Sequence, residues 1–209
     1  MLQDIFQNRL LPAVTLTDAD SALSVAEALL EGGINVMEIT FRTSATIEAV
    51  SAIAREFPEM HIGAGTILLP GQVSSAREAG AEFGLSPGFS EKVVIKVQDH
   101  DFPFIPGVST PSEIELALAY GYDLLKLFPA SDLGGVNYLQ SLNGPYHHSG
   151  VTFLTMGGVN LSNLESYLEQ DIVAAAGGSW LCPRKLIQEK EFNRITEIVQ
   201  KSVALADQI

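Results

Sequence analysis

The chain has 209 residues, 46% of them hydrophobic, which is enough for one sizeable core and lies near the short end of the range for single-domain barrels. Its 25 acidic and 12 basic side chains give a formal net charge of -13, which opposes binding to nucleic acid or to an anionic membrane surface. Because Cys182 is the only cysteine and the N-terminus lacks a signal-peptide pattern or any bilayer-spanning apolar run, we expect a cytoplasmic protein that does not enter a membrane.

Apolar runs alternate with longer amphipathic segments from the N-terminus to the C-terminus. The apolar runs predict eight strands: Leu10–Thr17, Ile34–Phe41, Met60–Thr66, Ala81–Ser86, Phe102–Pro106, Tyr122–Pro129, Val151–Met156 and Asp171–Ala176. The segments between them predict eight helices: Asp18–Leu30, Ser44–Phe57, Gly71–Ala79, Glu91–Asp99, Pro111–Ala119, Val136–Leu142, Leu161–Glu169 and Phe192–Ala206.

The ends of several helices carry their own signals. Thr17 or Asp18 is placed to cap the first helix, and Thr110–Glu113 puts a proline in the first turn with a carboxylate near the positive helix end. Glycines follow three of the predicted helices, where the chain turns back into the next strand and often needs a positive φ angle: Gly33, Gly80 and Gly121.

Strict alternation of strands and helices with short connections predicts parallel strands joined by right-handed crossovers. Eight such units favour a single (β/α)8 TIM barrel over residues 1–209, with Met1–Arg9 as a short helix covering its bottom. The competing architecture is a doubly wound open sheet, but no Gly-x-Gly-x-x-Gly follows the first predicted strand.

Charged residues near the end of the second predicted strand are the first candidates for chemistry, because barrel enzymes work at the carboxyl ends of their strands. Glu38 and Arg42 lie four residues apart with Thr40 between them, so all three side chains can project into the barrel mouth. A structural ion pair between the carboxylate and the guanidinium is the alternative.

Lys126 lies near the centre of the sixth predicted strand, flanked by Leu125 and Leu127. Burial disfavours the ammonium form and favours a neutral amine that can attack a ketone, which is how a Schiff-base lysine works. Arg42 could strengthen this effect or hold a substrate carboxylate. The alternative is a lysine that snorkels to solvent or pairs with a carboxylate such as Glu38.

Small residues and Pro-Gly pairs end the next strands. Gly63-Ala64-Gly65 precedes Thr66 and would let a ligand approach the backbone closely. Pro87-Gly88 and Pro106-Gly107 end the fourth and fifth predicted strands, where they shape a rigid rim or form simple turns.

Two glycine pairs after the last two strands indicate a phosphate site. Gly157-Gly158 follows the seventh strand, and Gly177-Gly178 with Ser179 follows the eighth. Backbone N–H groups and the Ser179 hydroxyl could converge there on one dianion, which would offset the repulsion expected from the net negative charge. Tight turns without a ligand are the alternative.

No metal site is expected. His147 and His148 are adjacent in a polar segment and have no third ligand nearby, so we interpret them as surface residues. Trp180 is interpreted as packing at the barrel rim.

Seven ordered motifs across nearly the whole chain resemble the class I 2-keto-3-deoxy-6-phosphogluconate (KDPG) and 4-hydroxy-2-oxoglutarate (KHG) aldolases. These motifs are Glu38-Ile39-Thr40-Phe41-Arg42-Thr43, Gly63-Ala64-Gly65-Thr66, Ser86-Pro87-Gly88, Ile105-Pro106-Gly107-Val108-Ser109-Thr110, Lys126-Leu127-Phe128-Pro129-Ala130, Gly157-Gly158-Val159 and Gly177-Gly178-Ser179-Trp180.

The resemblance implies a reversible lyase that cleaves KDPG to pyruvate and glyceraldehyde 3-phosphate, and KHG to pyruvate and glyoxylate. It assigns the Schiff base to Lys126 and acid–base catalysis to Glu38. It implies two further sets of contacts, to the pyruvate moiety from Arg42, Thr66, Pro87 and Phe128, and to phosphate from Gly157, Gly158, Gly178 and Ser179. It also implies a homotrimer without a metal or other cofactor.

Two positions depart from the family pattern. Met156 and Ser131 stand where relatives usually have threonine and glutamate. A thioether at Met156 removes a possible hydrogen bond and adds a flexible apolar wall, which leaves the substrate's stereochemistry and length open. The alternatives are an aldolase for the galactonate epimer, a phosphosugar isomerase on the same scaffold, and a non-catalytic phosphosugar-binding barrel.

Overall fold

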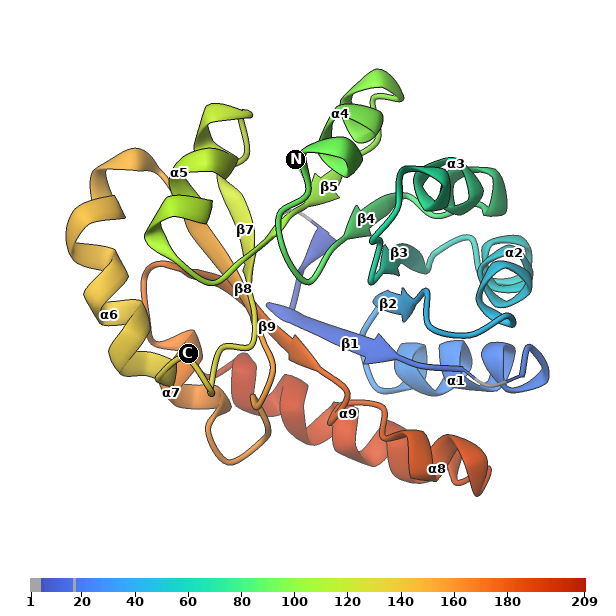
Figure 1. Cartoon of the computed structure of the whole chain (residues 1–209). Coiled ribbons are helices and arrows are strands. Elements are labelled where there is room, and N and C mark those ends of the chain that lie inside the picture. The colour runs from blue at the N-terminus through green and yellow to red at the C-terminus, as the bar shows by residue number, and fades with distance from the viewer. Residues whose placement is uncertain (1–4, 17) are drawn as a thin grey trace.

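The computed structural model describes residues 5–16 and 18–209, which form one closed barrel of parallel strands inside a ring of helices (Figure 1). The strands are β1 Leu10–Val14, β2 Val36–Thr40, β3 His61–Gly65, β4 Phe83–Leu85, β5 Phe104–Ile105, β6 Gly107–Val108, β7 Leu124–Leu127, β8 Thr152–Met156 and β9 Val173–Gly178. The helices are α1 Asp20–Glu31, α2 Thr46–Glu56, α3 Pro70–Ala79, α4 Glu91–Asp99, α5 Pro111–Ala119, α6 Gly135–Tyr146, α7 Leu164–Leu168, α8 Arg184–Gln188 and α9 Phe192–Ala206.

The barrel closes at a proline. The strands run in the order β5-β4-β3-β2-β1-β9-β8-β7-β6, and every pairing is parallel. β5 pairs with β4, whereas β6 pairs with β7, and only Pro106 separates β5 from β6. Proline has no N–H to donate, so the fifth barrel strand is interrupted there and counts as two. This explains nine strands where eight are predicted.

The core consists of the barrel interior and the layer between the strands and the helices. β2, β4 and β7 are buried along their whole length, as expected for strands covered on both faces. Phe83 and Phe153 are among the largest side chains that are fully buried. Charged residues in this core are limited to Glu38 and Lys126 among the residues that the structure describes.

The helix-end predictions are largely confirmed. Asp18 accepts hydrogen bonds from the backbone N–H and the hydroxyl of Ser21 at the start of α1, whereas Thr17 lies outside the described residues. Gly33, Gly80 and Gly121 have φ angles of 94°, 102° and 84°.

Glu113 caps α5 with one carboxylate oxygen. It accepts the N–H and hydroxyl of Ser109 at 2.7 and 2.9 Å, and those of Thr110 at 2.9 and 3.1 Å. Burial alone would raise the pKa of Glu113, but these four hydrogen bonds stabilise the carboxylate and lower the pKa overall.

Two predictions about elements need correction. The N-terminal helix over Met1–Arg9 is not confirmed: residues 1–4 lie outside the described part of the chain, and residues 6–9 form a turn that brings Arg9 N to 2.9 Å from Phe6 O. The short helix α8 is missing from the predicted set, because its five residues are too few to show a helical period.

Candidate active site

A cavity of about 360 Å³ opens at the carboxyl ends of β1, β2, β7, β8 and β9. Side chains at alternate positions of these strands face the barrel interior, so Glu38 and Thr40 of β2 line the same cavity as Lys126 and the following Phe128 of β7. The complete lining is Ala13, Thr15, Glu38, Thr40, Arg42, Lys126, Phe128, Met156, Gly157, Gly158, Val159, Asn160, Gly178, Ser179 and Trp180.

Glu38 and Lys126 meet across the barrel, although three strands separate β2 from β7 in the sheet order. The lysine Nζ donates to both carboxylate oxygens at 3.3 Å. Only 1% of Glu38 and 6% of Lys126 is exposed. The side chain of Lys126 therefore pairs with Glu38 and still reaches a cavity in which a ketone could approach its nitrogen.

The ring of Phe128 forms one wall beside the amine, with Lys126 Nζ at 5.6 Å from its centroid. An aromatic wall at this distance excludes water and tolerates a cation. The pairing expected as an alternative from the sequence, between Lys126 and Glu38, is thus present. No ion pair joins Glu38 to Arg42 within the described residues.

Gly65 makes room for the carboxylate. A methyl group on its Cα would overlap Oε1 and Cγ of Glu38, so only glycine fits beside this carboxylate. The sequence suggested that the small residues of β3 let a ligand approach. The correction is that Glu38 itself occupies the space beside Gly65.

Arg42 lies at the mouth of the cavity, two residues beyond the end of β2, and its side chain is exposed. Its guanidinium makes no side-chain hydrogen bond or ion pair with the described residues, and it and Lys126 are the only cations in the lining. Deeper in, the hydroxyls of Thr15 and Thr40 lie 2.8 Å apart. Thr15 was missed by the sequence reasoning, although its place just after β1, two residues beyond Ala13, is the signal that selected Arg42.

Two glycine loops close the opposite side of the cavity: residues 157–160 after β8 and residues 178–180 at the end of β9. Gly157 and Gly158 have φ angles of 90° and 82°, which favour glycine. Four backbone N–H groups in these loops donate to no acceptor in the described part of the chain, those of Gly158, Val159, Ser179 and Trp180. Unpaired backbone donors that converge on a cavity are the usual construction of an anion site.

Trp180 lines the wall next to Gly178, and its indole Nε1 is buried without an acceptor among the described atoms. The sequence reasoning placed this residue in rim packing, and Asn160 was not singled out at all. Asn160 and Trp180 each come two residues after a glycine pair, so the sequence indicated where they lie but not which atoms they contact.

Eight of the ten site residues expected from the sequence line the cavity, and Thr66 and Pro87 do not. Thr66 has a φ angle of 60°, and the next N–H, of Ile67, donates to Leu85 O, which turns the chain toward β4. Pro87 packs against Gly107, where an added methyl group would overlap its backbone. The roles expected for Thr66 and Pro87 therefore stay predictions.

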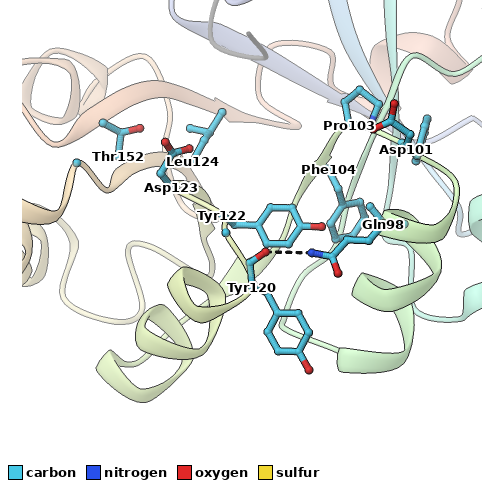
Figure 2. A pocket seen from close by; sticks show the side chains of 13 residues that line it. Gln98, Asp101, Pro103, Phe104, Tyr120, Tyr122, Asp123, Leu124 and Thr152 are labelled. Atoms are coloured by element: carbon cyan, nitrogen blue, oxygen red, sulfur yellow. Dashed lines mark hydrogen bonds between the residues drawn. The ribbon is translucent and has the colours of Figure 1, made fainter.

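A larger cavity lies at the other end of the barrel. It has about 560 Å³ and is lined by residues around the amino ends of β5 and β7 (Figure 2). Its wall combines aromatic rings, including Phe104 and Tyr122, with the carboxylates of Asp101 and Asp123, and contains no lysine, arginine or histidine among the described residues. Burial raises the pKa of Tyr122, which keeps this hydroxyl neutral. The volume of this cavity is larger, but it offers no nucleophile for a ketone.

His147 and His148 are exposed, as expected. The described residues contain no group of three or more histidine, cysteine or acidic side chains that could hold a metal ion. Within the same residues, no helix combines the length and the hydropathy needed to cross a bilayer.

The chain is similar to known proteins in sequence and in structure. Residues 2–198 match the family model described as KDPG and KHG aldolase. The 2-dehydro-3-deoxy-phosphogluconate aldolase of Treponema pallidum is 41% identical over 94% of this chain and 93% of its own length. The KHG/KDPG aldolase of Escherichia coli K12 is 40% identical over 92% of this chain and 89% of its own.

A solved structure extends the likeness to three dimensions. The KDPG aldolase of Legionella pneumophila, with pyruvate captured at low pH as a covalent carbinolamine intermediate, superimposes with a TM-score of 0.91. Its sequence is 37% identical, and the match covers 96% of this chain and 97% of that one.

Proposed function

The chain belongs to the family of KDPG and KHG aldolases, and from this membership we propose that it reversibly cleaves KDPG to pyruvate and glyceraldehyde 3-phosphate through a Schiff base on Lys126. The observation that carries the proposal is the buried contact of 3.3 Å between Lys126 Nζ and the Glu38 carboxylate. A single amine with an acid–base partner in a cavity is the minimum equipment of a class I aldolase.

The first half of the reaction forms the Schiff base. Lys126 Nζ first gives a proton to the Glu38 carboxylate, and the resulting neutral amine attacks the C2 carbonyl carbon. The nitrogen then loses a proton and the carbonyl oxygen gains one, which gives a carbinolamine. Glu38 is within reach to give a proton to the C2 hydroxyl as it leaves as water. The nitrogen lone pair then forms the C=N bond of the iminium.

The second half breaks the C3–C4 bond. A base removes the proton of the C4 hydroxyl, the C4–O electrons form the aldehyde, and the C3–C4 pair moves into the iminium to give an enamine. Protonation at C3 restores an iminium of pyruvate. Water then adds to C2, and loss of the amine frees pyruvate and Lys126. Glu38, directly or through a bound water, is the group placed to shuttle these protons.

The two sides of the cavity suit the two ends of this substrate. Arg42 at the mouth is free to bind the carboxylate, with Thr66, Pro87 and Phe128 as further contacts of the pyruvate moiety. The glycine loops, with Gly157, Gly158, Gly178 and the hydroxyl of Ser179, would hold the phosphate. These local donors matter because the net charge of -13 repels an anion at long range.

The same machinery accepts KHG, which yields pyruvate and glyoxylate. A second candidate substrate is the galactonate epimer of KDPG, because Met156 puts a flexible thioether in the cavity wall. Comparing kcat/KM for the three substrates ranks them, and a preference for the epimer would replace KDPG in this proposal.

We further expect one catalytic domain over residues 1–209 that assembles as a cytoplasmic homotrimer, needs no metal or other cofactor, and binds neither nucleic acid nor membranes. The family model supports the single domain, since it spans residues 2–198. Sedimentation equilibrium decides the subunit number, and full activity after dialysis against a chelator is the expected result for the cofactor.

Borohydride trapping tests the Schiff base. Incubation with pyruvate followed by reduction should add one pyruvate-derived mass to the peptide that contains Lys126, because borohydride reduces the imine to a stable amine. Lys126→Ala should lose both the adduct and KDPG cleavage, by at least about 10,000-fold in kcat/KM. Lys92→Ala, which removes an exposed lysine of α4, is the matched control and should keep both.

An adduct that forms equally in Lys126→Ala, or none at several pH values from folded wild-type protein, contradicts the proposal. Phosphosugar binding without any adduct or turnover would indicate a non-catalytic phosphosugar-binding barrel instead. Interconversion of a phosphosugar without an adduct would indicate an isomerase.

A further inference from the structure

The loop after β8 is fastened by a side chain that does not line the cavity. Asn163 donates from Nδ2 to Gly158 O at 3.0 Å, and its Oδ1 accepts the backbone N–H of Asn160 at 2.8 Å. Asn160 Nδ2 also donates to Gly158 O, at 3.2 Å. One amide group thus uses both its donor and its acceptor to hold the same short loop.

Helix capping does not account for these contacts. Asn163 precedes α7, but its side chain makes no capping hydrogen bond to that helix. Its carbonyl O accepts the hydroxyl of Ser166, which is a main-chain role that any residue could fill. The amide side chain is therefore committed to the glycine loop.

The hydrogen bonds to Gly158 O fix the direction of the next N–H group along the chain, that of Val159. In a trans peptide the C=O and the following N–H point in opposite directions in one plane. Gly158 O is turned toward Asn163, so the N–H of Val159 is turned away from it. Val159 is buried and lines the cavity, and its N–H has no acceptor among the described residues. Such a donor is costly unless a ligand satisfies it.

The other side of the loop is fixed by Ser131. Its backbone N–H donates to Gly157 O at 2.9 Å, and a methyl group on Gly158 would overlap its Cβ and Oγ, so the two segments are in close contact. The Ser131 hydroxyl lies 3.1 Å from the hydroxyl of Tyr167, a buried residue of α7. Gly158 is thus held between Ser131 on one side and Asn163 on the other.

We infer that Asn163 is a positioning residue for the phosphate end of the substrate, which acts by aiming the Val159 N–H into the cavity. The inference rests on the proposed function, because it assigns the phosphate of KDPG to the glycine loops. It separates two substrates of the same site: KDPG carries a phosphate that needs this donor, and KHG has none. Lys126 and Glu38 act on both in the same way.

The test is Asn163→Ala assayed with both substrates. We expect KM for KDPG to rise about tenfold with a small change in kcat, since one hydrogen bond to a charged group is lost or misdirected. Both kcat/KM for KHG and the rate of pyruvate trapping should stay within about twofold of the wild-type values. Asn193→Ala, which removes an exposed asparagine of α9, is the matched control and should change neither.

Tyr167→Phe provides a second variant that keeps the buried ring and removes only the hydroxyl beside Ser131. It should raise KM for KDPG in the same selective way but by less, because the backbone contact of Ser131 remains. If Asn163→Ala does not fold, Asn163→Ser, a residue favoured before a helix, replaces it.

Inorganic phosphate is the probe that does not depend on catalysis. Its dissociation constant, measured by calorimetry, should rise about tenfold in Asn163→Ala. Equal losses with KDPG and KHG, or unchanged phosphate affinity, overturn the inference even if wild-type protein traps pyruvate. If wild type fails to trap pyruvate but phosphate binding still weakens in the variant, the aldolase function falls and the role of Asn163 stands.

Discussion

The two ends of the barrel differ in the charged side chains and backbone groups that line their cavities. At the carboxyl end, the cavity of about 360 Å³ has a buried ion pair, an exposed guanidinium and four backbone N–H groups without an acceptor among the described residues. At the amino end, the cavity of about 560 Å³ is larger, but its lining has no cationic side chain among the described residues. The amide of Gln98 at its wall donates from Nε2 to Tyr120 O at 3.0 Å (Figure 2).

Arg9, which precedes β1 at the amino end of the barrel, shows the same difference between the two ends. Unlike the guanidinium of Arg42, that of Arg9 is hydrogen-bonded within the chain. It donates to the carbonyls of Leu168, Val173 and Ala174 at 2.7, 2.9 and 3.4 Å. Cationic side chains and backbone N–H groups that line a cavity without a partner in the chain, rather than the volume of the cavity, therefore mark the functional end. This difference implies that substitutions at the carboxyl end change activity and those at the amino end change stability.

Gly65→Ala should give the largest effect of the substitutions that follow from this comparison. The added methyl group overlaps the Glu38 carboxylate and must displace it from Lys126. A displacement of about 1 Å lowers kcat by about 100-fold. Steady-state kinetics measure it, with urea unfolding as the check on stability.

Gly71→Ala is its matched control, because no atom lies within 4 Å of the added methyl group in the first turn of α3. It should keep full activity and leave the protein equally or slightly more stable. Equal kcat values for the two variants would show that the position of Glu38 is not critical.

Arg9→Met should do the opposite: lower the free energy of unfolding by about 2 kcal/mol and leave kcat nearly unchanged, since three backbone carbonyls at the amino end lose their donor. Arg55→Met removes an exposed arginine whose one ion pair among the described residues is with the adjacent Glu56, and it should change stability by less than about 0.5 kcal/mol. A loss of activity without a loss of stability in Arg9→Met would break the contrast between the two ends.

The smallest expected effect concerns Cys182, a buried cysteine in the segment that follows β9 at the carboxyl end of the barrel. Burial raises the pKa of its thiol from 9.0 to about 12, so native protein at pH 8 should resist alkylation by iodoacetamide, and unfolded protein should react. The raised pKa stabilises the fold fully below pH 9, and this contribution is lost as pH rises toward about 12. Rapid alkylation of the native protein would mean that Cys182 is not shielded.

The sequence predicted the barrel and the reacting pair because both leave a local signal. Predicted apolar runs overlap every strand except β6, Gly107–Val108, and a charged residue inside such a run, as at Glu38 and Lys126, needs a special reason. The break at Pro106 was not foreseen, since it depends on which neighbour each half of the strand pairs with.

Contacts between distant segments were beyond the reach of sequence patterns. The space beside Gly65 was assigned to a ligand, because nothing along the chain shows that the Glu38 carboxylate fills it. The grip of Asn163 on Gly158 is local, but an asparagine before a helix has a more common explanation as a cap. Which of several ordinary roles a residue takes is decided by the fold.

The barrel wall is interrupted at Pro106, between β5 and β6, and this interruption is called the seam below. On either side of Pro106 the ladder runs to a different neighbour, and each half of this strand has two paired positions. The carbonyl of Pro106 nonetheless accepts the backbone N–H of Lys126 at 2.9 Å, which places the Schiff-base lysine next to the seam. In native-state hydrogen exchange, the amides of Ile105 and Gly107 should open before those of β2 and β8, and Lys126 therefore lies where the barrel wall opens first.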